Sequence, residues 1–165
     1  MRILLLEDQP LEAESITASL ERAFSGVVLD RVRTELEFRS RLDAITKDPP
    51  DIFIVDMMLP WTSVSEHMAE PPAEVMEGGY HRAGLRCQRL LAQQEETKDK
   101  TVIFYTVLER HDLDLKDRSA NVFHLRKESD HSALIRLIRA SYSATVVHDA
   151  IPSAFLTIRD QVLVS

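Results

Sequence analysis

The sequence predicts an α/β protein built on a doubly wound parallel β-sheet with helices on both faces. Short apolar runs rich in β-branched residues alternate with longer segments of helical period, which is typical of successive βα units. Three of the runs, ILLL, IFIV and VIFY, are continuously apolar, as strands are when helices cover both of their sides. With 165 residues, 44% of them hydrophobic, the chain can form one compact domain with appendages.

Five apolar runs are expected to form the strands of this sheet. The three continuously apolar runs should lie at its centre. The second run contains Asp30 and Arg31, so we expect it to form an edge strand. The five expected strands are residues 3–6, 27–32, 52–55, 102–105 and 122–125.

Helices are expected between these strands. In residues 11–24, apolar side chains at positions 16, 20 and 24 form one stripe. Thr34 and Glu37 have the spacing of a capping box at the start of a second helix, which the pair Pro49 and Pro50 ends. A third helix is expected at residues 84–96, and a last helix from Ser129 or Asp130 onward. Between them, residues 108–119 are expected to form a fourth helix that is short and weakly held.

Two segments fall outside this alternating pattern. Residues 61–83 contain two prolines and the pair Gly78 and Gly79, and show no convincing period. We interpret them as an insertion between the third strand and the third helix, which forms a lid or a partner-docking surface, or else a disordered elaboration. Residues 147–165 are too apolar for a free tail and are expected to dock on the domain or on a partner. The predicted division is therefore a domain at 1–146 and a C-terminal extension at 147–165.

Composition and charge narrow the class of protein. The net charge of −7 argues against nucleic acid and anionic membrane surfaces as main partners, because both require concentrated Lys and Arg. The apolar runs fall short of the roughly 18 residues that span a bilayer. The single cysteine, Cys87, cannot form an internal disulfide, so a reducing cytoplasm is the expected location.

Chemically useful side chains follow four of the five predicted strands. Glu7 and Asp8 follow the first strand, Asp56 the third, Thr106 the fourth and Lys127 the fifth. Parallel strands with right-handed crossovers end at the same edge of the sheet, where ligands bind, so these groups should converge. Clustered carboxylates need a cation, and all-oxygen ligation favours Mg²⁺. A carboxylate beside a hard metal, a hydroxyl and a lysine is a plausible acceptor for a phosphoryl group.

These residues resemble the receiver domains of two-component response regulators. The resemblance rests on LLLEDQP at the first strand, IVDMMLP around Asp56, VIFYT before the hydroxyl, and FHLRK ending in the lysine, and it covers roughly residues 2–145 without 61–83. It implies a flavodoxin-like sheet of order 2-1-3-4-5 and phosphorylation of Asp56. It also implies that Thr106 reports the phosphoryl group and Lys127 pairs with it. The implied Mg²⁺ ligands are Glu7, Asp8, Asp56 and the backbone carbonyl of Met58.

Three positions depart from the receiver pattern. Val107 stands where a small alanine usually follows the switch hydroxyl, and Glu128 stands where a proline usually follows the lysine. The position of the aromatic residue that usually moves with the hydroxyl is His124. Access to Asp56 and coupling through an aromatic rotamer are therefore expected to differ from the usual receiver.

Three functions remain in consideration. The leading hypothesis is a receiver that a histidine kinase or histidine phosphotransfer protein phosphorylates at Asp56 with Mg²⁺. It would act as a switch for a downstream protein partner rather than as a turnover enzyme, and a homodimer is also considered. The alternative is a pseudo-receiver that binds proteins without phosphorylation, favoured by Val107, Glu128 and His124. A Mg²⁺-dependent phosphohydrolase is less favoured, because the dehalogenase-like class needs a second Asp where Met58 stands.

Overall fold

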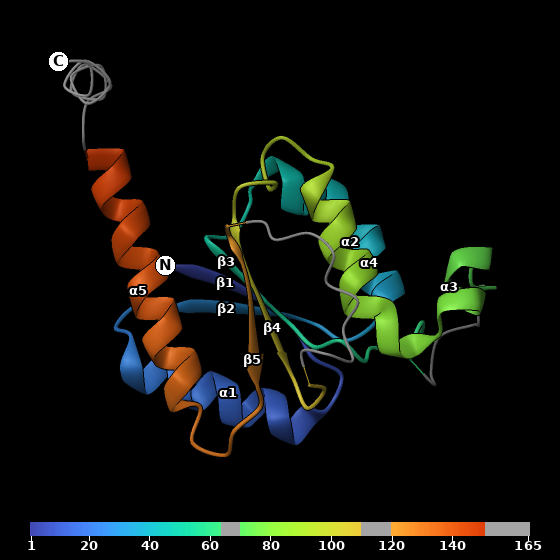
Figure 1. Ribbon diagram of the computed structural model, residues 1–165, viewed down its shortest axis with the longest axis horizontal. Coiled ribbons are helices and arrows are strands. Elements are labelled where there is room, and N and C mark those ends of the chain that lie inside the picture. Colours follow the sequence, from blue (N-terminus) through green and yellow to red (C-terminus); the bar gives the residue numbers. More distant parts are fainter. Residues whose placement is uncertain (64–69, 110–119, 151–165) are drawn as a thin grey trace, which may run out of the picture.

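The computed structural model has a five-stranded, all-parallel sheet with the order β2-β1-β3-β4-β5 (Figure 1). It describes residues 1–63, 70–109 and 120–150. The predicted α/β class and strand order are confirmed, and β2 is an edge strand as expected. The strands are β1 (Arg2–Leu6), β2 (Val28–Val32), β3 (Ile52–Val55), β4 (Thr101–Thr106) and β5 (Val122–Arg126).

Helices connect the strands close to where the sequence predicted them. The predicted cap at Thr34 is present, because its Oγ1 accepts the N–H of Glu37 at 3.1 Å. Pro10 occupies the first turn of the first helix, where its missing N–H costs no hydrogen bond. The helices are α1 (Pro10–Ala23), α2 (Glu35–Lys47), α3 (Ala73–Gly78), the 3₁₀ turn η1 (Tyr80–Arg82), α4 (Ala83–Ala92) and α5 (Ser132–Ala150).

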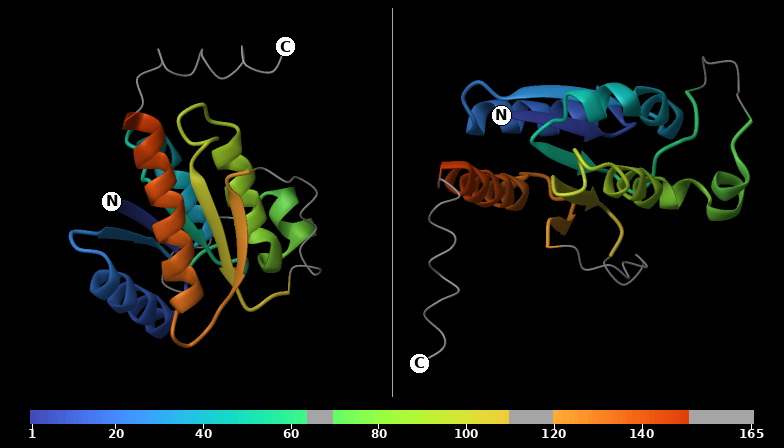
Figure 2. Two further views of the ribbon diagram at one scale, coloured as in Figure 1. Left: turned by 60° about the vertical axis from the view of Figure 1, so that its left-hand side comes forward. Right: turned by 90° about the horizontal axis from the view of Figure 1, so that it is seen from above.

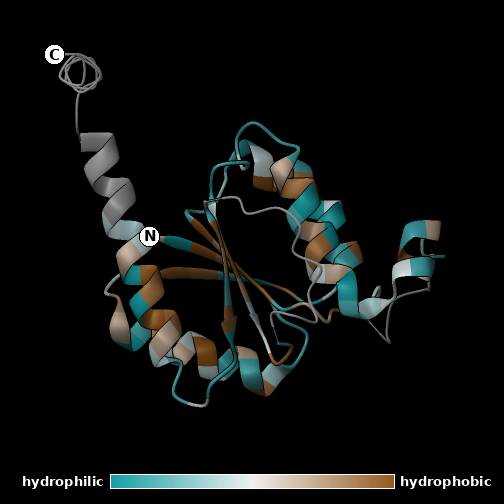
Figure 3. Ribbon diagram, viewed as in Figure 1, coloured by the Kyte–Doolittle hydropathy of each residue, from teal (hydrophilic) through white to brown (hydrophobic). Residues whose placement is uncertain are grey.

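Side chains alternate between the two faces of the sheet along each strand, so the buried residues form two cores, one on each face. The face under α1 and α5 is lined by Ile3, Leu5, Ile52, Ile54, Ile103 and Tyr105. The face under α2 and α4 is lined by Leu4, Leu6, Phe53, Val55, Val102 and Phe104. Figure 3 shows mostly apolar colour along the central strands and alternating apolar and polar residues along the helices. Cys87 of α4 is fully buried in the second core, as expected for a packing residue.

The described part of residues 61–83 contains more regular structure than the sequence indicated. α3 and η1 form where no helical period was evident, because a helix of six residues is too short to display one. α3 lies beside the start of α4 and away from the sheet in both views of Figure 2. Glu74 of α3 forms an ion pair with Arg39 of α2 at 2.6 Å. Among the described residues, 70–83 donate no hydrogen bond or ion pair to the strand-end carboxylates.

Three other expectations involve the ends of the described segments. Helix α5 continues past the expected boundary between residues 146 and 147 and reaches Ala150. Residues 151–165, whose docking was expected, and residues 110–119, which hold most of the expected weak helix, lie outside the described residues. None of the described helices is long and apolar enough to cross a membrane.

Candidate functional site

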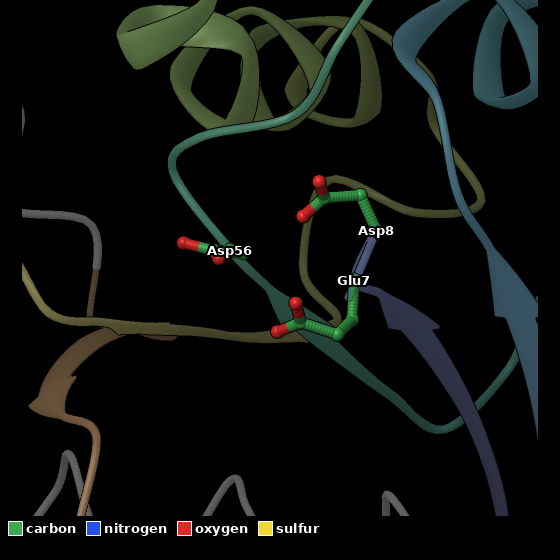
Figure 4. A group of neighbouring side chains, drawn as sticks. All are labelled: Glu7, Asp8 and Asp56. Atoms are coloured by element: carbon green, nitrogen blue, oxygen red, sulfur yellow. The ribbon is translucent and has the colours of Figure 1, made fainter. Parts of the chain in front are cut away.

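Three carboxylates meet at the carboxyl ends of β1 and β3. Glu7 and Asp8 follow β1, Asp56 follows β3, and the register that pairs Leu6 with Val55 sets the two chain ends side by side. Each carboxylate offers one oxygen, and these oxygens lie within 4.8 Å of one another (Figure 4). Glu7 and Asp56 are 1% and 3% exposed, while Asp8 is half-buried. The predicted convergence of these three residues is present.

Backbone N–H groups and one arginine hold the carboxylates in place. The N–H of Gln9 donates to Glu7 Oε1 at 3.1 Å, and the N–H of Met58 donates to Asp56 Oδ1 at 3.3 Å. The Arg31 guanidinium on β2 donates to the carbonyl oxygens of Glu7 and Asp8, both at 2.9 Å. The turn between β1 and α1 is therefore fixed from the neighbouring strand.

Gly84 lets α4 approach the chain immediately after β3. A Cβ at this position would lie 2.5 Å from the Asp56 carbonyl oxygen and 2.9 Å from Met57 Cα. Its N–H donates to the Met57 carbonyl at 3.1 Å. Because both close atoms belong to the backbone, a larger residue would displace the Asp56 segment.

Lys127 bridges two of the three carboxylates. Its Nζ lies 2.6 Å from Glu7 Oε2 and 2.7 Å from Asp56 Oδ2, and its side chain is 10% exposed. Burial alone would lower the pKa of Lys127, but the charges and hydrogen bonds of Asp56 and Glu7 outweigh burial and raise it. Burial raises the pKa of Glu7, with Lys127 acting in the opposite direction. Lys127 therefore stays charged and offsets part of the carboxylate repulsion.

Thr106 ends β4 beside this cluster. It is fully buried, and its Oγ1 accepts the N–H of Leu108 at 3.4 Å. Its carbonyl accepts the N–H of Lys127 at 2.9 Å, which ties the end of β4 to the start of the lysine loop. Val107, the next residue, is 54% exposed. The side chain of His124 is held by a hydrogen bond from Nε2 to the Leu108 carbonyl at 3.1 Å, so Nε2 carries the proton.

Comparison with known proteins places the fold. No protein-family profile matches the chain, and no curated protein matches its sequence. The CheY-like response regulator receiver domain from Methylobacillus flagellatus is 21% identical, with a TM-score of 0.59 over 86% of this chain and 98% of that one. The signal receiver domain of a signal transduction histidine kinase from Syntrophus aciditrophicus is 20% identical, with a TM-score of 0.60 over 92% and 95%. The Mn²⁺-bound form of response regulator Rcp1 is 17% identical, with a TM-score of 0.55 over 84% and 89%.

The chain has the receiver fold. The acidic cluster of this receiver fold fits a divalent cation, because all its donors are carboxylate oxygens, which hard cations prefer. It is the one such group of three found in the described part of the chain. The similar regulator Rcp1 is described in a Mn²⁺-bound form.

Sequence reasoning missed three residues that support the site in this receiver fold. Arg31 was interpreted only as an interruption of an edge strand, although it clamps the carbonyls of Glu7 and Asp8. Residue 105 was expected only as part of a central strand, and His131 was given no role. The two residues hydrogen-bond to each other at 2.7 Å across the sheet edge. No local pattern signals such a pair, since they come from β4 and from the loop before α5.

Proposed function

We propose that this chain is a phosphoacceptor receiver of a two-component phosphorelay, phosphorylated on Asp56. The observation that carries the proposal is the Lys127 ammonium, which contacts Asp56 and Glu7 at 2.7 and 2.6 Å at the carboxyl end of a receiver fold. Buried carboxylates with a paired lysine in such a crevice are candidates for chemistry rather than for structure.

The proposed reaction is a phosphoryl transfer to a carboxylate. An Asp56 oxygen attacks the phosphorus of a phosphohistidine on the donor protein, a P–O bond forms, and the P–N bond breaks. The donor imidazole leaves with the bonding electrons and takes up a proton. Lys127 lies within reach of the Asp56 oxygen and neutralises negative charge on the incoming group. Thr106, buried at the end of β4, supplies a hydroxyl that can respond to the new anion.

We assign Mg²⁺ to the acidic cluster. Glu7, Asp8 and Asp56, with the carbonyl of Met58, would hold it. The ion would screen the carboxylates and stabilise charge on the phosphoryl oxygens. Its binding requires Lys127 to share Glu7 and Asp56 with the metal, since the ammonium contacts both residues.

The proposed biological role is a protein-interaction switch. The donor is a histidine kinase or histidine phosphotransfer protein, and the output is a downstream protein partner. Since the acyl phosphate forms on the protein itself, the chain is a signalling domain rather than a turnover enzyme. The similar receiver from Syntrophus aciditrophicus is described as part of a signal transduction histidine kinase, which supports a kinase as partner.

The test is phosphorylation by a small donor. The purified chain is incubated with Mg²⁺ and phosphoramidate, and intact mass is followed with time. We expect one added phosphoryl group on wild type, none on Asp56→Asn, and full labelling of Asp43→Asn, which changes an exposed aspartate of α2. Labelling that persists in Asp56→Asn, or a wild type that takes up no phosphate, would reject the proposal.

The second candidate is a pseudo-receiver that binds proteins without phosphorylation. It is favoured by His124, which stands at the usual aromatic position and is tied to the Leu108 carbonyl at 3.1 Å. A residue held in this way does not supply the usual ring movement. A folded wild type, confirmed by circular dichroism, that binds Mg²⁺ but takes up no phosphate would favour this candidate over the first.

A further inference from the structure

His131 is a buried histidine in the loop that follows the lysine. It is 2% exposed and has a φ of +52°, a left-handed conformation that few residues other than glycine adopt. It lies immediately before α5, and its carbonyl accepts the N–H of Ile135 in the first turn. Both ring nitrogens have partners, although none of the residues proposed for the chemistry touches the ring.

The first partner of His131 is the Tyr105 hydroxyl. It lies 2.7 Å from His131 Nδ1, in a residue that is 1% exposed and directly precedes Thr106. The same hydroxyl accepts the backbone N–H of Glu128 at 3.1 Å. Glu128 directly follows Lys127, whose own N–H donates to the Thr106 carbonyl at 2.9 Å. The backbone N–H groups of Lys127 and Glu128 are therefore both hydrogen-bonded to residues of β4.

The second partner of His131 is on α1. Its Nε2 lies 2.9 Å from Ser15 Oγ. α1 begins at Pro10, two residues after the Asp8 carboxylate. A continuous set of hydrogen bonds thus runs from α1 through His131 and Tyr105 to the lysine loop. It joins the segment that carries Glu7 and Asp8 to the segment that carries Lys127, on the side of the sheet where α1 and α5 pack (Figure 1).

We propose that His131 and Tyr105 are positioning residues for Lys127, which hold its loop so that the ammonium lies between Glu7 and Asp56. This inference rests on the proposed phosphoacceptor function. The imidazole fixes the direction of the Tyr105 hydroxyl, and the hydroxyl fixes the Glu128 amide. Removing the hydroxyl leaves His131 Nδ1 and the Glu128 N–H without this partner. Removing the imidazole takes a partner from the Ser15 and Tyr105 hydroxyls, and the Tyr105 hydroxyl can then donate only to the Glu128 carbonyl at 3.1 Å, which loosens its hold on the loop.

The test compares phosphorylation rates of variants that delete single links. Tyr105→Phe removes only the hydroxyl, and Tyr80→Phe makes the same change at an exposed tyrosine of η1. His131→Gly removes the imidazole, and glycine accepts the φ of +52° without strain. Rates are measured by intact mass with Mg²⁺ and phosphoramidate. We expect a loss of about tenfold in Tyr105→Phe and His131→Gly, and no loss in Tyr80→Phe.

Two further measurements separate positioning from general loosening of the fold. If Tyr105 acts through Lys127, adding Tyr105→Phe to Lys127→Met should slow the residual reaction no further, whereas a general effect would lower that rate as well. Free imidazole should restore the phosphorylation rate of His131→Gly. It should leave the rate of Tyr105→Phe unchanged, because that variant lacks the hydroxyl with which the imidazole forms its hydrogen bond. Equal rates for Tyr105→Phe and Tyr80→Phe, or additive losses in the double variant, would overturn the inference.

A separate readout keeps this inference distinct from the proposed function. Amide hydrogen exchange at Glu128 reports the loop directly and needs no phosphorylation. We expect faster exchange at Glu128 in Tyr105→Phe and unchanged exchange in Tyr80→Phe. If wild type takes up no phosphate, the proposed function fails. If wild type is phosphorylated and Glu128 exchanges equally in both variants, the positioning inference fails by itself.

Discussion

The Arg86 guanidinium on α4 and the Glu35 carboxylate at the start of α2 form a buried ion pair on the face of the sheet opposite α1 and α5. Arg86 Nε lies 2.9 Å from Glu35 Oε1, and Arg86 Nη2 lies 2.6 Å from Glu35 Oε2. The side chains are 7% and 1% exposed. Arg86 Nη2 also donates to the Gly79 carbonyl at 3.0 Å, and Arg39 links Glu35 to Glu74. The pair therefore anchors the described part of residues 61–83 to the domain.

Breaking this ion pair should destabilise the fold strongly. Within the described part of the chain, Arg86→Met leaves the Glu35 carboxylate buried with Arg39 as its one charged partner, and such losses cost about 3 kcal/mol. Urea unfolding should show this decrease in the free energy of unfolding. Arg2→Met is the matched control, since its pair with Asp48 is exposed and worth about 1 kcal/mol or less. The double variant Glu35→Gln/Arg86→Met should be less destabilised than Arg86→Met. Equal costs for Arg86→Met and Arg2→Met would contradict the interpretation.

Removal of the Lys127 charge should make the free energy of unfolding fall, relative to wild type, as the pH rises. Burial and the Asp56 charge raise the pKa of Glu7 above its ordinary value of 4.5, and Lys127 opposes this shift. A group whose pKa is raised in the folded state contributes fully to the free energy of unfolding at pH values below its unfolded-state pKa. This contribution is lost as the pH rises through its folded-state pKa. In Lys127→Met the pKa of Glu7 rises further. The variant should therefore be close to wild type near the ordinary pKa of Glu7, and less stable by about 3 kcal/mol at neutral pH.

Urea unfolding of Lys127→Met across this pH range checks the direction. Lys98→Met serves as the control, because Lys98 pairs with Glu95 on the surface. In wild type the raised pKa of Lys127 means that its contribution persists through neutral pH and is lost only above the ordinary lysine range. A constant difference between wild type and Lys127→Met at all pH values would show that the carboxylates do not depend on this ammonium.

The strands and the meeting of the acidic residues could be predicted because both follow from local pattern and topology. Continuous apolar runs mark buried parallel strands, and every such strand must end at the same edge, so Glu7, Asp8 and Asp56 had to approach one another. The roles of these residues in phosphorylation and metal binding remain predictions. What could not be predicted depends on pairs of residues from different elements. The hydrogen bond between Tyr105 and His131 joins positions far apart in sequence.

The short helix α3 shows a second limit of sequence patterns. With six residues it buries Val75 alone, so no apolar period exists to be recognised. It also contacts another element through the Glu74 pair with Arg39, which no local pattern in residues 73–78 signals. Arg31 shows the same limit on β2, where an arginine that interrupts an apolar run holds the carbonyls of Glu7 and Asp8, just after β1. Charged residues in such positions are informative only once their partners are known.

The apolar side chains that follow Asp56 and Thr106 by two residues should make the proposed acyl phosphate long-lived. Met58 and Leu108 are half-buried beside Asp56 and Thr106, with their backbone N–H groups 3.3 and 3.4 Å from Asp56 Oδ1 and Thr106 Oγ1. Neither side chain can orient a water or accept its proton, so hydrolysis proceeds without general-base help. After removal of the donor, intact mass should show the phosphoryl group persisting well beyond seconds.

A polar residue at position 58 should shorten this lifetime. Met58→Asn places an amide beside Asp56 that can hold the attacking water, and we expect hydrolysis to accelerate several-fold. Met76→Asn makes the same change on α3 at a methionine that is 71% exposed, and should leave the lifetime unchanged. Loss of the phosphoryl group from wild type within seconds would contradict the prediction. The lifetime is measured after the donor has been removed. This comparison therefore tests the environment of Asp56 independently of the rate at which the donor reacts.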